Sequence, residues 1–124
     1  MKALILGLFL FYGQGEDATI REIGVALKSG SSKELIQYCN NTVEIKIDGQ
    51  SSNYSQAQAE VVLKKFFGQN PAKNFNYIHQ GSSPEGLKYN IGRYVHENGS
   101  YRVVMFIKKI GDNYLIDTLN FSKE

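Results

Sequence analysis

Three runs rich in β-branched and aromatic residues lie close together in the C-terminal third of the chain: LKYNIGRYVH at 87–96, YRVVMFI at 101–107 and YLIDTLNF at 114–121. Residues of these types favour β-strands. The dipeptide Asn98-Gly99 between the first two runs tolerates the positive φ pair of a type I′ turn, and Gly111-Asp112-Asn113 separates the last two. We therefore predict an antiparallel meander of three strands.

The predicted turn also assigns the faces of the meander. A two-residue turn at Asn98-Gly99 would pair Glu97 with Ser100 and, further along, Tyr94 with Val103. Because side chains alternate along a strand, one face would then collect a largely apolar set: Asn90, Gly92, Tyr94, His96, Tyr101, Val103, Met105 and Ile107.

The last run breaks this alternation. Leu119 and Phe121 have the opposite parity to Tyr114 and Ile116, so a regular strand would turn one of the two pairs away from the core. We predict a β-bulge near residues 117–118 that returns both pairs to the same face. The alternative is a straight strand with an exposed ion pair between Asp117 and Lys108.

Upstream, capping boxes and apolar spacing predict two short helices, a strand and a longer helix. Thr19 with Glu22, Ser31 with Glu34, and Ser55 with Gln58 each have the form of a capping box. We expect helices over 19–28, 31–39 and 55–68, strands over 43–48 and 74–80, and a loop over 49–53. This order is typical of an α+β domain with about three helices on one face of an antiparallel sheet of four to five strands.

The N-terminus indicates export. Lys2 precedes an apolar run over 3–12, and small residues follow at Gly13 and Gly15. This pattern is typical of a signal peptide at residues 1–15, cleaved to leave a single domain over 16–124. A membrane anchor is the alternative, but a spanning helix needs roughly 20 apolar residues. We expect a secreted or periplasmic protein with no membrane span in its mature form.

Charge and cysteine content exclude several classes of protein. The chain has 14 Lys and Arg against 12 Asp and Glu, too even a balance for nucleic-acid binding. Cys39 is the only cysteine, so no disulfide framework forms, and we interpret it as a small buried hydrophobe. His79 and His96 do not make a metal-ligand cluster. We therefore assign no metal, no cofactor and no catalytic residue.

The other face of the meander is too apolar to remain in water. It carries Leu87, Tyr89, Ile91, Arg93, Val104 and Phe106. The helices cover only one side of the sheet, so we expect this face to form the interface of a two-fold homodimer.

The element order, the helix over 55–68 and the ending Arg102-Val103-Val104, Lys108 to Asp112 and Tyr114 to Phe121 resemble the nuclear transport factor 2-like superfamily. Within it, the chain is most similar to the uncharacterised secreted bacterial domain-of-unknown-function family 4783. The resemblance implies a curved sheet wrapped by helices into a cone, in a cystatin-like layout, with a pocket at the open end and dimers through the convex face. It does not settle function, because the fold hosts enzymes and binding proteins alike.

Two functions remain open on these residues. The first is a noncatalytic domain that binds a small apolar ligand or an envelope protein, with a pocket lined by Phe67, Asn90, Tyr94, His96, Tyr101 and Met105. These side chains would otherwise fill a solid core. The second is an isomerase or dehydratase-like enzyme, which needs a carboxylate and a phenol or acid together in the cone. The residues of suitable type are Asp48, Asp117, Tyr38, Tyr54, Tyr94 and Tyr101.

Overall fold

The structure is a computed structural model that describes residues 15–84 and 87–124. In these residues three helices and six strands follow one another: α2 (Glu16–Ser29), α3 (Ser32–Ile36), β1 (Cys39–Ile47), β2 (Gln50–Ser55), α4 (Gln56–Gln69), β3 (Ala72–Ser82), β4 (Lys88–His96), β5 (Gly99–Ile110) and β6 (Asn113–Lys123). The predicted signal peptide, Gly15 excepted, lies outside the described residues. Within those ranges no helix has the length and apolar character needed to cross a membrane.

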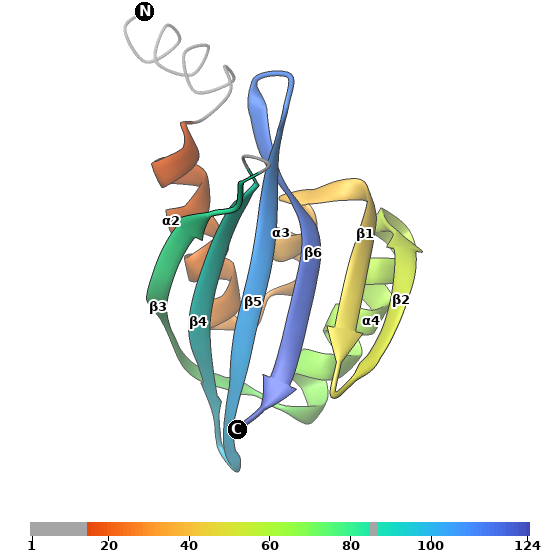
Figure 1. Cartoon of the computed structure of the whole chain (residues 1–124). Helices are drawn as coiled ribbons and strands as arrows, with labels where there is room; N and C mark the ends of the chain where they lie inside the picture. Colours follow the sequence, from red (N-terminus) through yellow and green to blue (C-terminus); the bar gives the residue numbers. More distant parts are fainter. Residues whose placement is uncertain (1–14, 85–86) are drawn as a thin grey trace, which may run out of the picture.

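The strands form one curved sheet in the order β2-β1-β6-β5-β4-β3 (Figure 1). Neighbouring strands run antiparallel, except that β1 and β6 run parallel. The three helices lie against the same face of the sheet, which we call the inner face (Figure 1). The predicted α+β class is confirmed, but the sheet is mixed and has six strands rather than four to five.

The additional strand is β2, which occupies most of the segment predicted as a loop. Five of its six residues are exposed and only Tyr54 is half-buried. A strand with no buried face shows no apolar alternation, so its sequence resembles a polar loop. Its structure comes from pairing with β1, where Val43 lies opposite Tyr54.

The meander of β4, β5 and β6 is confirmed, with a different register at its first hairpin. The loop is Glu97-Asn98 rather than Asn98-Gly99, because His96 pairs with Gly99 and Tyr94 with Tyr101. The Asn98 N–H donates to Nδ1 of His96 at 3.3 Å, and Gly99, with φ of 148°, already belongs to β5. The register differs from the predicted one by two residues, so every side chain keeps its predicted face.

The predicted bulge in the last strand is also confirmed. Phe106 pairs with Thr118, whereas the next residue of β5, Ile107, pairs with Ile116. Asp117 is therefore the extra residue on β6. The bulge leaves Ile116, Leu119 and Phe121 fully buried on the inner face.

Of the three predicted capping boxes, one is complete, one is half-formed and one is wrong. Helix α2 begins at Glu16 with Gly15 as its N-cap, so Thr19 lies inside the helix and is buried. Ser31 caps α3 by accepting a hydrogen bond from the Glu34 N–H. Ser55 and Gln58 form the complete reciprocal box at the start of α4, as predicted.

The core lies between the inner face and the helices. Ile23 and Leu27 of α2, Leu63 of α4 and Cys39 of β1 are fully buried in it. Burial raises the pKa of the Cys39 thiol to about 12, so this cysteine stays protonated and unreactive. The three described helices therefore cover the inner face of the sheet.

Candidate functional site

The residues predicted to line a pocket are all buried on the inner side of the sheet. Phe67, Tyr94, Tyr101 and Met105 belong to the hydrophobic core, and Asn90 and His96 are buried polar residues. The structure therefore brings the six residues to the predicted face, in a densely packed setting.

Aromatic packing fills the centre of this face. The Phe66 ring lies 4.3 Å from that of Phe121 and 5.0 Å from that of Tyr101, centroid to centroid. The Tyr94 hydroxyl donates to the backbone oxygen of Asn70 at 2.5 Å. Burial raises the pKa of Tyr94 to about 12, which keeps this phenol neutral. The side chains that sequence patterning selected thus pack against one another.

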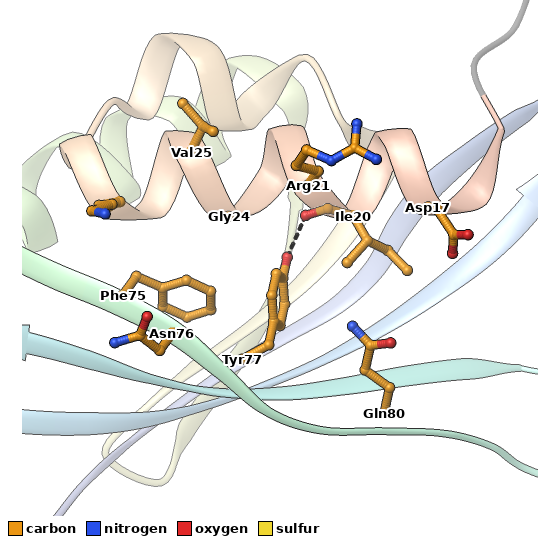
Figure 2. A pocket seen from close by; sticks show the side chains of 10 residues that line it. Asp17, Ile20, Arg21, Gly24, Val25, Phe75, Asn76, Tyr77 and Gln80 are labelled. Carbon is orange, nitrogen blue, oxygen red and sulfur yellow. Dashed lines mark hydrogen bonds between the residues drawn. The ribbon is translucent and has the colours of Figure 1, made fainter.

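A cavity of about 380 Å³ does lie between helix α2 and strand β3 (Figure 2). We call it the α2 groove, and it is lined by Asp17, Ile20, Arg21, Gly24, Val25, Lys28, Phe75, Asn76, Tyr77 and Gln80.

Tyr77 sets the depth of the α2 groove. Its ring stands between β3 and α2, and its hydroxyl donates to the backbone oxygen of Ile20 at 2.6 Å (Figure 2). The ring fits beneath the helix because Gly24 has no side chain, and a Cβ there would lie 3.0 Å from Cε2 of Tyr77. Burial raises the pKa of Tyr77, so the hydroxyl remains a donor. Because this hydroxyl is bonded to the helix backbone, Tyr77 presents mainly its aromatic ring to the groove.

A second cavity of about 210 Å³ adjoins the α2 groove. The two cavities share Asp17, Ile20 and Gln80 as walls, so they lie side by side under the first turns of α2. We call the second one the Asn90 cavity, and its remaining walls are Glu16, Gly81, Ser82, Lys88, Tyr89 and Asn90. Of the six predicted pocket residues, Asn90 alone borders either of these two cavities.

A third cavity, of about 510 Å³, lies between α4 and the strands β1 and β2. Asp48 stands at its edge, and the Tyr101 hydroxyl donates to Oδ2 of Asp48 at 3.4 Å. This is a carboxylate and a phenol in contact, as the enzyme hypothesis requires. Asp48 is nevertheless exposed on the β1–β2 turn, where its other oxygen accepts the Lys123 N–H at 3.3 Å. Burial and the Asp48 carboxylate raise the pKa of Tyr101.

The remaining candidate acids and ligands are dispersed. Asp117 accepts a hydrogen bond from Asn40 at 3.4 Å and lies on the β6 bulge. His79 is exposed on β3, whereas His96 is buried. Among the residues that the structure describes, no three His, Cys, Asp or Glu side chains gather in a metal-binding arrangement.

The face of the sheet away from the helices carries the predicted dimer residues, and none of the three described helices lies over it (Figure 1). Arg93 is exposed and forms an ion pair with Glu124, 2.9 Å from Nε to Oε1. The others, together with Val95, are half-buried within the single chain. We call this set the outer patch: Leu87, Tyr89, Ile91, Val95, Val104 and Phe106.

Sequence reasoning did not single out the α2 groove. Ile20 and Gly24 lie within the predicted helix over 19–28, and Tyr77 lies within the predicted strand over 74–80. The one available signal was Gly24, because a glycine within an apolar helical stripe leaves space where another residue would fill it.

Comparison with known proteins assigns the family. The family profile described as "Domain of unknown function (DUF4783)" matches residues 20–122. The chain belongs to the DUF4783 family. Among curated proteins, no match to the chain is found.

Solved structures of DUF4783 proteins show the same fold. One from Bacteroides ovatus is 34% identical, with a TM-score of 0.78 over 83% of this chain and 93% of that one. Another, from Bacteroides fragilis, is 30% identical, with a TM-score of 0.78 over 83% of this chain and 96% of that one.

More distant structures place the fold in the nuclear transport factor 2-like group. An NTF-2 like protein of unknown function from Burkholderia xenovorans has a TM-score of 0.65 at 8% identity, over 87% of this chain and 83% of that one. At this identity the likeness concerns the fold alone. The predicted family is confirmed, and so is the nuclear transport factor 2-like fold that the resemblance implies.

Proposed function

We propose that this DUF4783 domain is a noncatalytic binding domain of the cell envelope that holds a small apolar ligand in the α2 groove. The observation that carries the proposal is an open cavity of about 380 Å³ with mainly apolar walls between α2 and β3. Ligand pockets are usually about 300–1,000 Å³ with mostly apolar walls and a few polar groups. The α2 groove has this size and composition.

The walls of the groove favour an uncharged, apolar molecule. Ile20, Phe75 and the Tyr77 ring supply apolar surface, and the Tyr77 hydroxyl is already bonded to the helix backbone. Asp17, Arg21 and Lys28 line the groove from α2 with charges of both signs. The main contribution to affinity is therefore burial of apolar area, about 25 cal/mol per Å².

Export belongs to the same proposal. Lys2, the apolar run over 3–12 and the glycines that follow it support a signal peptide and a secreted or periplasmic location. An apolar carrier in the envelope would receive its ligand outside the cytoplasm.

We also propose that the domain forms a homodimer through the outer patch. Half-buried aromatic and β-branched side chains lie side by side there, and the Tyr89 and Phe106 rings are 6.4 Å apart. Contiguous apolar surface of this kind typically marks an interaction site. A different envelope protein on this face is the alternative partner.

The contact between Tyr101 and Asp48 is the one observation in favour of an isomerase or dehydratase-like enzyme. A general base of that type works from an apolar, water-poor site. Because Asp48 is exposed and already accepts two hydrogen bonds, we favour binding over catalysis. Proton exchange from a model ketone, abolished by Asp48→Asn, would reverse that preference.

A pair of matched variants tests the ligand site. Val25 lines the α2 groove and is 51% exposed, so Val25→Trp should narrow the groove without disturbing the core. Val61 on α4 is 69% exposed and lies outside the groove, so Val61→Trp is the control. With the fluorescent apolar probe N-phenylnaphthylamine, we expect Val25→Trp to weaken binding about tenfold and Val61→Trp to leave it unchanged. Equal affinities in the two variants, or no binding to the wild-type chain, would reject the α2 groove.

A further inference from the structure

Asn90 carries a buried side-chain amide that makes no hydrogen bond to any described residue. It is 1% exposed, and neither its Nδ2 nor its Oδ1 has a hydrogen-bond partner among the described residues. An amide has two donor hydrogens and an acceptor oxygen, and leaving them unmet in a protein interior is strongly destabilising. A partner outside the described chain would remove that penalty.

The position of Asn90 indicates where this partner lies. Asn90 borders the Asn90 cavity, and the residue opposite it on β3, Gln80, is a wall of both that cavity and the α2 groove. Figure 2 shows the Gln80 side chain rising from β3 toward α2, next to Ile20 and Asp17. One elongated molecule in the apolar groove would therefore extend past Gln80 toward the wall that Asn90 forms.

We propose that the ligand ends in an amide group, a carboxamide or a lactam, that pairs with the side chain of Asn90 while its apolar body lies in the α2 groove. This inference rests on the proposed function of that groove. The Asn90 amide presents a donor and an acceptor side by side in one plane, and another amide presents the complementary acceptor and donor. A pair of hydrogen bonds then satisfies one donor hydrogen and the oxygen of Asn90 together.

Other polar groups fit less well. A carboxylate offers only acceptors, so it would leave Oδ1 of Asn90 unmet, and it would lie near Glu16 and Asp17. An ammonium group offers only donors and would leave Nδ2 unmet. Among the described walls of the Asn90 cavity the basic residue is Lys88, which donates to Oγ of Ser82 at 3.1 Å, and the two carboxylates of Glu16 and Asp17 outweigh its charge. The group that fits Asn90 best is therefore uncharged and carries both a hydrogen-bond donor and an acceptor.

Ordered water is the competing occupant. The Asn90 cavity, about 210 Å³, has room for several waters at about 30 Å³ each. Water would satisfy Asn90 equally well with any apolar molecule in the groove. If a ligand amide pairs with Asn90, the protein should prefer ligands that end in an amide. If water fills the cavity, the protein should show no such preference.

The experiment compares two probes of equal length on the purified chain, by calorimetric titration. Octanamide carries the terminal amide, and methyl heptyl ketone replaces its NH₂ group by a methyl group. We expect octanamide to bind about ten- to hundredfold more tightly, because the ketone leaves the Asn90 oxygen without a donor. In Asn90→Leu the preference should disappear, and the melting temperature of the unliganded chain should rise by a few degrees.

The outcomes separate the two proposals. Equal affinities of the two probes for the wild-type chain would overturn the amide assignment and leave the α2 groove as an apolar site. A preference for octanamide that persists in Asn90→Leu would also overturn it. Binding of neither probe would reject the groove itself. Because the probes are compared first on the wild-type chain, the decisive result does not require the variant to fold.

Discussion

Gly92 lies on the inner face at a position where an added side chain would clash with its neighbours. A Cβ on this residue of β4 would overlap the Phe75 ring and would lie 3.0 Å from the backbone oxygen of Asn76. We predict that Gly92→Ala destabilises the protein by about 1–3 kcal/mol through overpacking. Urea unfolding measures this change.

Gly68 of α4 is the matched control, since nothing lies within 4 Å of the Cβ that Gly68→Ala would add. This variant should stabilise the protein by up to about 1 kcal/mol, because alanine has the higher helix propensity. Equal and small effects at both glycines would contradict the packing described around Phe75.

The buried tyrosines predict a loss of stability in alkali. Burial raises the pKa of Tyr94 from 10.0 to about 12 and raises that of Tyr77 as well. Above pH 10 the unfolded chain releases these phenolic protons while the folded chain retains them. The unfolded state then binds fewer protons, so the contribution of these phenols to the free energy of unfolding should be constant below about pH 10 and fall as pH rises toward 12. The buried Cys39 thiol, whose pKa is raised from 9.0 to about 12, adds a loss of the same sign that begins near pH 9.

Urea unfolding across this pH range provides the measurement, with Tyr94→Phe as the comparison. The variant should lose stability less steeply with pH than the wild-type chain, because one of the buried phenols is missing. A slope unchanged by the substitution would show that Tyr94 ionises alike in the two states.

At the scale of elements, α4 depends on its capping box. Oγ of Ser55 accepts the Gln58 N–H at 3.3 Å, and Oε1 of Gln58 accepts the Ser55 N–H at 3.1 Å. We predict that Ser55→Ala lowers the free energy of unfolding by about 1 kcal/mol. Ser55→Asp should retain most of that stability, because aspartate also caps a helix. Thermal unfolding of both variants tests this. Equal losses in the two would mean that hydrogen bonding at the cap contributes little.

Sequence patterning predicted the elements that have one buried face. The meander, its faces and the β6 bulge follow from the parity of Tyr114, Ile116, Leu119 and Phe121, because burial enforces that parity. Patterning did not find β2, whose polar residues are ordered by pairing with β1. Nor did it find the parallel pairing of β1 with β6, since the choice of a distant neighbour is a tertiary property.

Local sequence pattern likewise accounts for only part of the candidate site. Alternation placed Tyr94, Tyr101 and Met105 on the inner face, but it does not distinguish a side chain that lines a cavity from one that fills the core. The α2 groove exists because α2 crosses β3 with Gly24 above Tyr77. That crossing depends on the packing of two elements far apart in the sequence, so a local sequence pattern does not predict it.

At the scale of the molecule, the outer patch predicts dimerisation. Val104→Arg should place a charge in the interface and yield a monomer in sedimentation equilibrium, whereas Val61→Arg on the exposed side of α4 should leave a dimer. Both variants should melt near the wild-type temperature when corrected for the loss of association. A wild-type chain that is monomeric at tens of micromolar would remove this prediction.

The central claim is that ligands bind in the α2 groove, and chemical-shift mapping tests it most directly. Octanamide titrated into the ¹⁵N-labelled chain should shift the backbone amides of Ile20, Gly24, Tyr77 and Gln80 most strongly, with those of Val104 and Phe106 in the outer patch unmoved. Shifts confined to the outer patch or to the cavity beside Asp48, or no saturable shifts at all, would contradict the account.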